Sequence, residues 1–299
     1  MRGCSVGEAE EQPVSSGRPM APTSLRRHYP DQVPTVGGAS AALSALVGSR
    51  ISTHRTPGAR DLGLAAVSAQ SRPTRPAPPE GIGPLRRQRL EWARLYFVCD
   101  ARPLGEDPEP LLRAALTGGA GMIELRDRES PRNAVERSGQ TFRRLADTYS
   151  ALFIVNDDPY LAVELRADGV HLGQEDISAA EAREILGPEA IVGLSTHSRE
   201  QIEAAAEQPV DYISVGPIWE TPTKEGRPGT GLELIREAAR IATVPWFAIG
   251  GINTENVAEV VEAGARRICV VRAIKDADDP AAAARALVDA VEAADTAER

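Results

Sequence analysis

The sequence has few cysteines, few lysines and no long uninterrupted apolar run. Its three cysteines, Cys4, Cys99 and Cys269, are widely spaced, which excludes a disulfide framework and a zinc-ligand pattern and fits a reducing compartment. No segment approaches the length of a membrane span, and the apolar stretch AALSALVG is too short and too far into the chain for a secretory signal. We therefore expect a cytoplasmic protein without a membrane partner.

The balance of basic and acidic residues changes near residue 94. The formal net charge is −9, with 13 arginines against 7 acidic residues through Arg94 and 21 basic against 36 acidic residues afterwards. An acidic body of this kind does not favour nucleic acid or a membrane surface as a partner. Any phosphate contacts must come from a few local basic residues.

Residues 1–88 are rich in Pro, Ser, Gly and Arg, as in the stretch SRPTRPAPPEGIGP. This composition lacks the apolar spacing that offsets ordering entropy, so it predicts a mostly disordered extension. Glu8, Glu10 and Glu11 argue against a transit peptide. A solvated linker, a start codon assigned too far upstream and a contact with an anionic partner all stay open for it. The folded domain is expected at residues 89–299.

Eight short apolar runs follow one another between Leu95 and Arg272. Each ends in small, polar or charged residues, and most of the segments between them carry apolar residues at helical spacing. Strand and helix alternating eight times over roughly 200 residues predict a (β/α)8 barrel, whose active site lies at the carboxyl ends of the strands. The runs read LYFVCD, MIELRDR, LFIVNDD, VHLGQED, IVGLSTH, YISVGP, WFAIGG and RICVVR.

The run MIELRDR ends with charged residues on one face. Residues two apart in a strand point the same way, so Glu124, Arg126 and Arg128 share a side. Two arginines there can bind a phosphate through paired N–H donors, and the carboxylate can orient them. An ion-paired rim of the barrel is the alternative.

Short carboxylates follow the third and fourth runs. Asp157 in VNDD and Asp176 in GQED can converge on Mg²⁺, which favours one or two carboxylates together with waters and substrate phosphates. Asp158 and Glu175 are rivals for the same role. Asp158 precedes Pro159 and can instead cap the next helix.

The fifth run ends in LSTHS, where Ser195 offers a hydroxyl for phosphate and His197 an imidazole for proton transfer. No glycine-flanked nucleophile elbow surrounds Ser195, which argues against covalent serine catalysis. His171 lies among apolar neighbours in VHLGQ and is interpreted as a hydrogen-bonded structural histidine.

The segment GPIWETPTKEGRPGTG is long and rich in Gly and Pro, which is typical of an active-site loop. It contains Lys224, one of two lysines in a chain with 32 arginines, so a compact ammonium that contacts phosphate is indicated there. A solvated loop lysine is the alternative.

The seventh and eighth runs predict a second phosphate site. Gly250 and Gly251 in IGGIN allow close approach of the backbone to a ligand, and the backbone amides of Val270 and Val271 can complete the site. Loops after these two strands commonly bind phosphate in such barrels. A simple tight turn is the alternative for the glycine pair.

The motifs LRDR, VNDD, HLGQED, STHS, GPIWETPTK, AIGGIN and AGARRICVVRAI resemble the thiamine-phosphate synthase family in order and spacing, from about Leu95 to Val291. The resemblance implies a (β/α)8 transferase of thiamine biosynthesis. It would join 4-amino-2-methyl-5-(diphosphooxymethyl)pyrimidine to 4-methyl-5-(2-phosphoethyl)thiazole, with Mg²⁺, and give thiamine phosphate and diphosphate. The implied reaction is a dissociative substitution that needs no protein nucleophile.

The resemblance also implies roles for individual residues. The catalytic residues would be Arg126, Ser195 and Lys224, and the metal ligands Asp157 and Asp176. The pyrimidine diphosphate would be held by Glu124, Leu125, Arg126, Asp127, Arg128, Asn156, Ser195 and Lys224. The thiazole phosphate would be held by Thr221, Thr223, Gly250, Val270 and Val271.

Two positions depart from the family, which usually has Gln where this chain has Glu124 and Lys where it has Arg128. A carboxylate beside a diphosphate would repel it unless Arg126 or a bound proton compensates.

Two other functions are weighed against the synthase. A thiazole tautomerase of the same barrel family would use His197 for proton transfer, but it has no diphosphate to neutralise, so Asp157, Asp176 and Lys224 favour the synthase. The second is a non-catalytic module that binds thiazole phosphate or thiamine phosphate. A homo-oligomer is compatible with the barrel, although no feature of the sequence indicates one.

Overall fold

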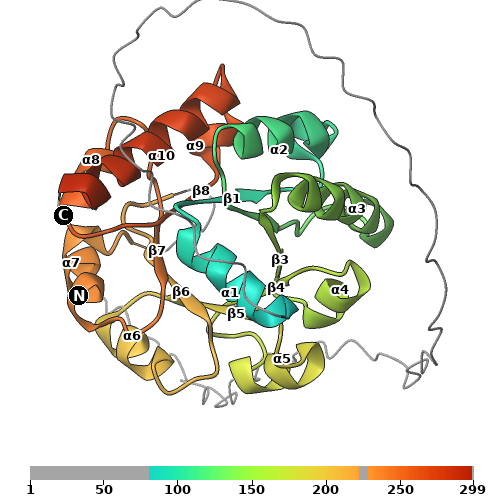
Figure 1. Ribbon diagram of the computed structural model, residues 1–299, viewed down its shortest axis with the longest axis horizontal. Coiled ribbons are helices and arrows are strands. Elements are labelled where there is room, and N and C mark those ends of the chain that lie inside the picture. The colour runs from blue at the N-terminus through green and yellow to red at the C-terminus, as the bar shows by residue number, and fades with distance from the viewer. Residues whose placement is uncertain (1–80, 222–227, 298–299) are drawn as a thin grey trace, which may run out of the picture. The chain divides into compact units, whose positions relative to one another are not determined.

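Eight parallel strands close into a barrel in the computed structural model, which describes residues 81–221 and 228–297 (Figure 1). Each strand pairs with the next, and β8 pairs with β1, so the predicted (β/α)8 barrel is confirmed. Each strand overlaps one of the eight apolar runs. The strands are β1 (Leu95–Cys99), β2 (Met122–Leu125), β3 (Leu152–Asn156), β4 (Gly169–Leu172), β5 (Ile191–Thr196), β6 (Tyr212–Val215), β7 (Trp246–Ile249) and β8 (Ile268–Val270).

Helices surround the strands, apart from α1, which lies across the barrel opening in Figure 1. None of the helices within the described ranges is long and apolar enough to cross a bilayer. The helices are α1 (Ile82–Trp92), α2 (Pro108–Thr117), α3 (Arg132–Tyr149), α4 (Pro159–Glu164), α5 (Ala179–Leu186), α6 (Arg199–Ala205), α7 (Gly231–Ile241), α8 (Val257–Glu262), α9 (Arg272–Lys275) and α10 (Pro280–Ala297), with a 3-10 turn η1 (Pro103–Gly105).

Both faces of the strands are buried, which explains why the runs read as almost continuously apolar. Alternate residues point to opposite faces, so one set fills the barrel and the other packs under the helices. The side chains that fill the barrel are Tyr96, Val98, Met122, Leu152, Ile154, Ile191, Tyr212, Phe247 and Cys269. Phe97, Phe153 and Phe142 belong to the outer layer, between strands and helices.

Helix α1 spans the position at which the domain boundary was expected. It begins at Ile82, so the boundary expected at residue 88 falls inside a helix, and the remainder of the expected disordered extension, residues 1–80, lies outside the described residues. The sequence shows no apolar periodicity for this helix, because only Gly83 and Leu90 of it are buried. Leu90 packs on the side chains inside the barrel.

Two aspartates, the buried Asp168 and the partly buried Asp211, bind α1 to the amino ends of the strands. Asp168, directly before β4, accepts from Arg86 Nε at 2.8 Å, from Arg143 Nη1 at 2.9 Å and from the backbone N of Phe153 at 2.9 Å. Asp211, directly before β6, accepts from Arg87 Nε at 2.8 Å. Ionic hydrogen bonds therefore hold a helix that offers little apolar surface.

Replacing Asp168 should destabilise the barrel. In Asp168→Ala, two arginines that are mostly buried lose their shared carboxylate, and the free energy of unfolding should fall by about 3 kcal/mol, measured by urea denaturation. The matched control is Asp147→Ala, because Asp147 also binds Arg143 but its side chain is 66% exposed; its effect should stay below about 1 kcal/mol. Equal losses in the two variants would contradict this account of α1.

Candidate active site

A cavity of about 880 Å³ opens at the carboxyl ends of the strands. Its volume lies toward the upper end of the usual range for small-molecule sites. Most of the residues singled out in the sequence meet here, although they come from seven segments of the chain. The expected residues that line it are Glu124, Arg126, Arg128, Asn156, Asp157, Asp176, Ser195, Thr221, Gly250, Val270 and Val271.

The alternation predicted for β2 places its charged residues correctly. Glu124, Arg126 and Arg128 line the cavity, whereas Leu125 packs in the outer core. Asp127 turns away and accepts hydrogen bonds from the backbone N of Ala101, Glu129 and Ser130, at 2.7 to 3.0 Å. The side chains of Leu125 and Asp127 therefore stabilise the scaffold and do not line the cavity.

Asp157 and Asp176 lie together on one side of the cavity. Asp157 has a left-handed backbone, with φ of 63°, and its backbone N donates to His171 O at 2.8 Å. Burial, and then the neighbouring Asp176 carboxylate, raise the pKa of the Asp157 carboxyl above its ordinary value. Arg128 Nη2 donates to Asp157 Oδ2 at 3.2 Å and partly offsets this repulsion. Two adjacent carboxylates in a partly dry site suit a divalent cation.

Asp158 is not part of this pair. Its side chain accepts from the backbone N of Leu161 at 2.9 Å and caps α4, as the sequence alternative foresaw.

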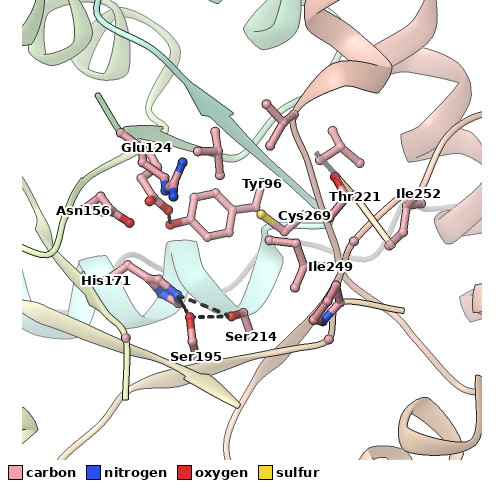
Figure 2. Close-up of a pocket in the computed structure, with 18 of the residues that line it drawn as sticks. Tyr96, Glu124, Asn156, His171, Ser195, Ser214, Thr221, Ile249, Ile252 and Cys269 are labelled. Atoms are coloured by element: carbon pink, nitrogen blue, oxygen red, sulfur yellow. Dashed lines mark hydrogen bonds between the residues drawn. The ribbon is translucent and has the colours of Figure 1, made fainter. Parts of the chain in front are cut away.

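A line of hydrogen-bonded, buried polar groups lies at the floor of the cavity, and Figure 2 shows Tyr96, Glu124, His171, Ser195 and Ser214 of it. The hydroxyl of Tyr96 donates to Glu124 Oε2 and lies 3.1 Å from the hydroxyl of Tyr212. His171 Nδ1 lies 2.9 Å from Tyr212 Oη, and His171 Nε2 lies 3.0 Å from Ser195 Oγ. His171 is therefore the hydrogen-bonded buried residue that the sequence predicted, and it also lines the cavity.

The tyrosines of this line were missed by the sequence analysis. Tyr96 and Tyr212 lie at inward positions of β1 and β6, and burial together with the Glu124 carboxylate raises the pKa of both phenols well above the ordinary value. Gly193 makes room for one of them, since a Cβ there would lie 2.1 Å from Cζ of Tyr212. The sequence contained one indication of this packing: an isolated glycine within a strand, here in the run IVGLST, often marks the close approach of another group.

The opposite side of the cavity is formed by the ends of β7 and β8. Gly250 and Gly251 have φ of 108° and 72°, which favours glycine. A Cβ at Gly250 would lie 2.5 Å from the backbone of Pro217, so packing against the end of β6 requires this glycine in addition to any ligand. Val270 and Val271 follow on the neighbouring strand and line the same side.

Arg272 is a lining residue that the sequence analysis missed. It is exposed at the start of α9 and lines the cavity directly after Val271. Within the described ranges its guanidinium forms no ion pair or hydrogen bond with another side chain. Two of the expected residues, Thr223 and Lys224, lie outside the described residues.

His197 also lines the cavity. Its Nδ1 lies 2.5 Å from the backbone O of Gly216, which fixes the ring, and its backbone N donates to Gln201 Oε1 at 2.7 Å.

A family model described as thiamine monophosphate synthase matches residues 95–274. The thiamine-phosphate synthase of Acidothermus cellulolyticus is 48% identical over 194 residues, which cover 64% of this chain and 92% of the relative. That of Mycobacterium tuberculosis (strain CDC 1551 / Oshkosh) is 47% identical over 223 residues, covering 70% of this chain and all of the relative.

Among solved structures, the thiamine phosphate pyrophosphorylase from Pyrococcus furiosus is similar to this chain with a TM-score of 0.62 and 35% identity. The match covers 70% of this chain and 98% of that one. The family model and the relatives cover the barrel and its cavity, and the chain belongs to the thiamine monophosphate synthase family.

Proposed function

We propose that this chain is a thiamine-phosphate synthase of thiamine biosynthesis. It joins 4-amino-2-methyl-5-(diphosphooxymethyl)pyrimidine to 4-methyl-5-(2-phosphoethyl)thiazole and releases diphosphate. The observation that carries the proposal is a single cavity with two separate sides suited to anions. One side has Arg126 beside the carboxylate pair, and the other has the Gly250 turn beside Arg272. Two anionic substrates can bind face to face in such a cavity.

The side formed by β2, β3 and β4 suits the diphosphate. Arg126 is half-buried, and in the part of the chain that the structure describes no side chain binds its guanidinium, so its donors are available to phosphoryl oxygens. The repulsion between Asp157 and Asp176 is the kind that a divalent cation relieves. Mg²⁺ held by these two carboxylates would supply positive charge to the leaving diphosphate. Lys224 is proposed to add an ammonium from the loop after β6.

The side formed by β7 and β8 suits the thiazole phosphate. Gly250 has no side chain to obstruct a ligand, and the backbone of Val270 and Val271 lies next to it along the cavity wall. Arg272 adds a planar fork of donors that matches a phosphate. Thr221, buried on this wall, and Thr223 are proposed to donate to the same group.

The proposed reaction needs positioning more than covalent catalysis. The bond from the pyrimidine methylene carbon to the diphosphate oxygen breaks, and its electron pair leaves with the diphosphate. The thiazole nitrogen then gives its lone pair to that carbon. Arg126 and Lys224 stabilise the charge that develops on the diphosphate, and the two anion-binding sides hold the reacting atoms in line.

A tautomerase and a binding module are the competing functions. The tautomerase would leave the pair Asp157 and Asp176 without a role, and a binding module would not need charge on both sides of the cavity. The cytoplasm is the proposed location, because Cys99 and Cys269 are free thiols, as in a reducing compartment.

Product formation tests the function directly. Purified protein is incubated with the pyrimidine diphosphate, the thiazole phosphate and Mg²⁺, and then with each component left out, while diphosphate release and product mass are measured. Thiamine phosphate should appear only in the complete mixture. A folded protein that isomerises the thiazole phosphate, or binds it without turnover, would replace this function with one of the two competing ones.

The neighbouring aspartates Asp157 and Asp158 should differ sharply in their effect on turnover. Asp157→Asn should lower kcat/KM by about a hundredfold, because charge stabilisation in the transition state is lost, and Lys224→Ala should have an effect of the same order. Asp158→Asn is the matched control: asparagine also caps helices well, so kcat/KM should stay within about threefold. Similar kinetics for both aspartate variants would refute the metal-ligand assignment.

The two cavity-lining arginines should affect different substrates. Arg272→Ala should raise KM for the thiazole phosphate by about tenfold or more, since a hydrogen bond to a charged group contributes about 1.5 to 3 kcal/mol. Arg126→Ala should instead lower kcat and raise KM for the pyrimidine diphosphate. The check is a steady-state analysis with each substrate varied in turn. Effects on the same substrate would show that the two sides are not separate.

A further inference from the structure

A line of buried polar groups beneath the cavity takes no part in the bond breaking and bond formation of the proposed reaction. This polar line consists of Glu124, Tyr96, Tyr212, His171, Ser195 and Ser214. Its members are almost completely buried: Glu124, Ser195 and Ser214 are each 2% exposed, and Tyr212 is fully buried. They come from five different strands. Buried polar groups must be hydrogen-bonded to be tolerated, and here the bonds connect end to end, from Glu124 to Ser195 and Ser214.

Counting protons fixes the direction of this line. A carboxylate only accepts hydrogen bonds, and a phenol has one proton. Tyr96 uses that proton in its hydrogen bond to Glu124. The hydroxyls of the two tyrosines lie 3.1 Å apart, so Tyr212 must be the donor in the hydrogen bond between them. Burial keeps both phenols protonated, because it raises their pKa well above the ordinary value.

The direction continues through the imidazole. Because the Tyr212 hydroxyl already donates a hydrogen bond to Tyr96, Tyr212 Oη can only accept a hydrogen bond from His171 Nδ1, which lies 2.9 Å away. In a neutral ring Nε2 then has a lone pair, which accepts a hydrogen bond from Ser195 Oγ, 3.0 Å away. Ser214 Oγ lies farther from Nε2, at 3.4 Å, and 3.5 Å from Ser195 Oγ, to which it donates.

We propose that Glu124 sets the direction of this hydrogen-bond line and so makes Ser195 Oγ an acceptor toward the cavity, where it receives the amino group of the pyrimidine. Tyr96, Tyr212 and His171 are positioning residues that transmit the direction. The Ser195 hydroxyl already donates its hydrogen bond to His171 Nε2, so a lone pair of Ser195 Oγ faces the ligand. This changes the role expected from the sequence, in which the hydroxyl of Ser195 donates to a phosphate.

The chemistry of the ligand favours an amino group at this position. Two lone pairs that meet, on Ser195 and on a phosphoryl oxygen, would repel each other, whereas an N–H donor completes the line. A site that is built to hydrogen-bond one substrate group rejects an analogue lacking it strongly, because buried polar groups are then left unpaired. The identity of the ligand rests on the proposed function, but the direction of the line rests on the contacts alone.

The direction can be measured without any substrate. Nitrogen-15 NMR of the full chain with labelled histidine distinguishes the two neutral tautomers, and the signal of His171 among the four histidines is identified by its loss in His171→Asn. The expected result is protonation at Nδ1 with a lone pair at Nε2. In Tyr212→Phe, which removes the acceptor of the Nδ1 proton, the population should move to the Nε2–H tautomer. An Nε2–H tautomer in the unmodified protein would overturn the proposal.

Substitution of the carboxylate itself gives a second test of direction. In Glu124→Gln the amide can accept from Tyr96 through its oxygen or donate to it through its nitrogen, so both directions become available. The His171 spectrum should then show a mixture of tautomers. An unchanged single Nδ1–H tautomer in this variant would show that Glu124 does not set the direction.

Ligand binding tests the recognition step. The probes are 4-amino-5-hydroxymethyl-2-methylpyrimidine and its 4-methoxy analogue, which has no amino proton. Calorimetry should show at least tenfold weaker binding of the methoxy probe, and Ser195→Ala should bring the ratio close to one. The control is Ser138→Ala, which removes another buried serine hydroxyl, bonded to Ala101 O at 2.7 Å, and should leave the ratio unchanged.

The outcomes separate the two claims. Equal binding of both probes to the unmodified protein would overturn amino recognition by Ser195 even if the tautomer is as expected. If neither probe binds and the complete reaction mixture gives no thiamine phosphate, while the NMR shows the Nδ1–H tautomer, the synthase function fails and the direction of the line stands.

Discussion

Closure of the parallel sheet is the constraint on which the rest of the structure depends. Because β8 pairs with β1 and every strand runs the same way, all eight carboxyl ends meet on one rim. Residues as far apart in sequence as Glu124 and Arg272 thereby line one cavity. Closure also buries both faces of every strand, so a polar side chain at an inward position must find its partners inside the barrel.

The barrel interior meets this requirement by separating apolar from polar layers. Toward the amino ends, Met122, Leu152 and Ile191 pack with Leu90 of α1. Toward the carboxyl ends, inward positions are taken by Glu124, His171 and Ser195, which bond to one another through the two tyrosines. The phenol rings belong to the apolar packing and their hydroxyls to the polar line, which is the usual division in a buried tyrosine. The floor of the cavity is thus closely packed and polar at the same time.

Glu124 now has a structural explanation. Where the resemblance leads one to expect an amide, the carboxylate lines the cavity and accepts a hydrogen bond from the hydroxyl of Tyr96. The guanidinium of Arg126 is two residues further along the same face of β2 and is available for the phosphates. One oxygen of the Glu124 carboxylate is thus engaged with the barrel interior, at the start of the hydrogen-bond line.

The sequence predicted the strands and the rim residues because period-two alternation and polar strand ends are local patterns. It predicted the pairing of Asp157 with Asp176 on the same grounds.

Helix α1 could not be predicted, since its stability comes from ion pairs with Asp168 and Asp211, far away in sequence. Tyr96 and Tyr212 were not singled out, because a hydroxyl in an apolar run gives no sign of its partner. Arg272 was overlooked although it ends the run RICVVR, because only the backbone amides of Val270 and Val271 were assigned to the phosphate there. The carboxylate of Asp127 binds backbone N–H groups of neighbouring loops, which a strand pattern does not reveal.

The most direct test of the central claim, that two anions bind on opposite sides of one cavity, is a crystal structure with thiamine phosphate, diphosphate and Mg²⁺. The account predicts diphosphate against Arg126 with the cation between it and the pair Asp157 and Asp176, and the phosphate of thiamine phosphate beside Gly250 and Arg272. Both anions on one side, or diphosphate at the β7 and β8 side, would contradict it.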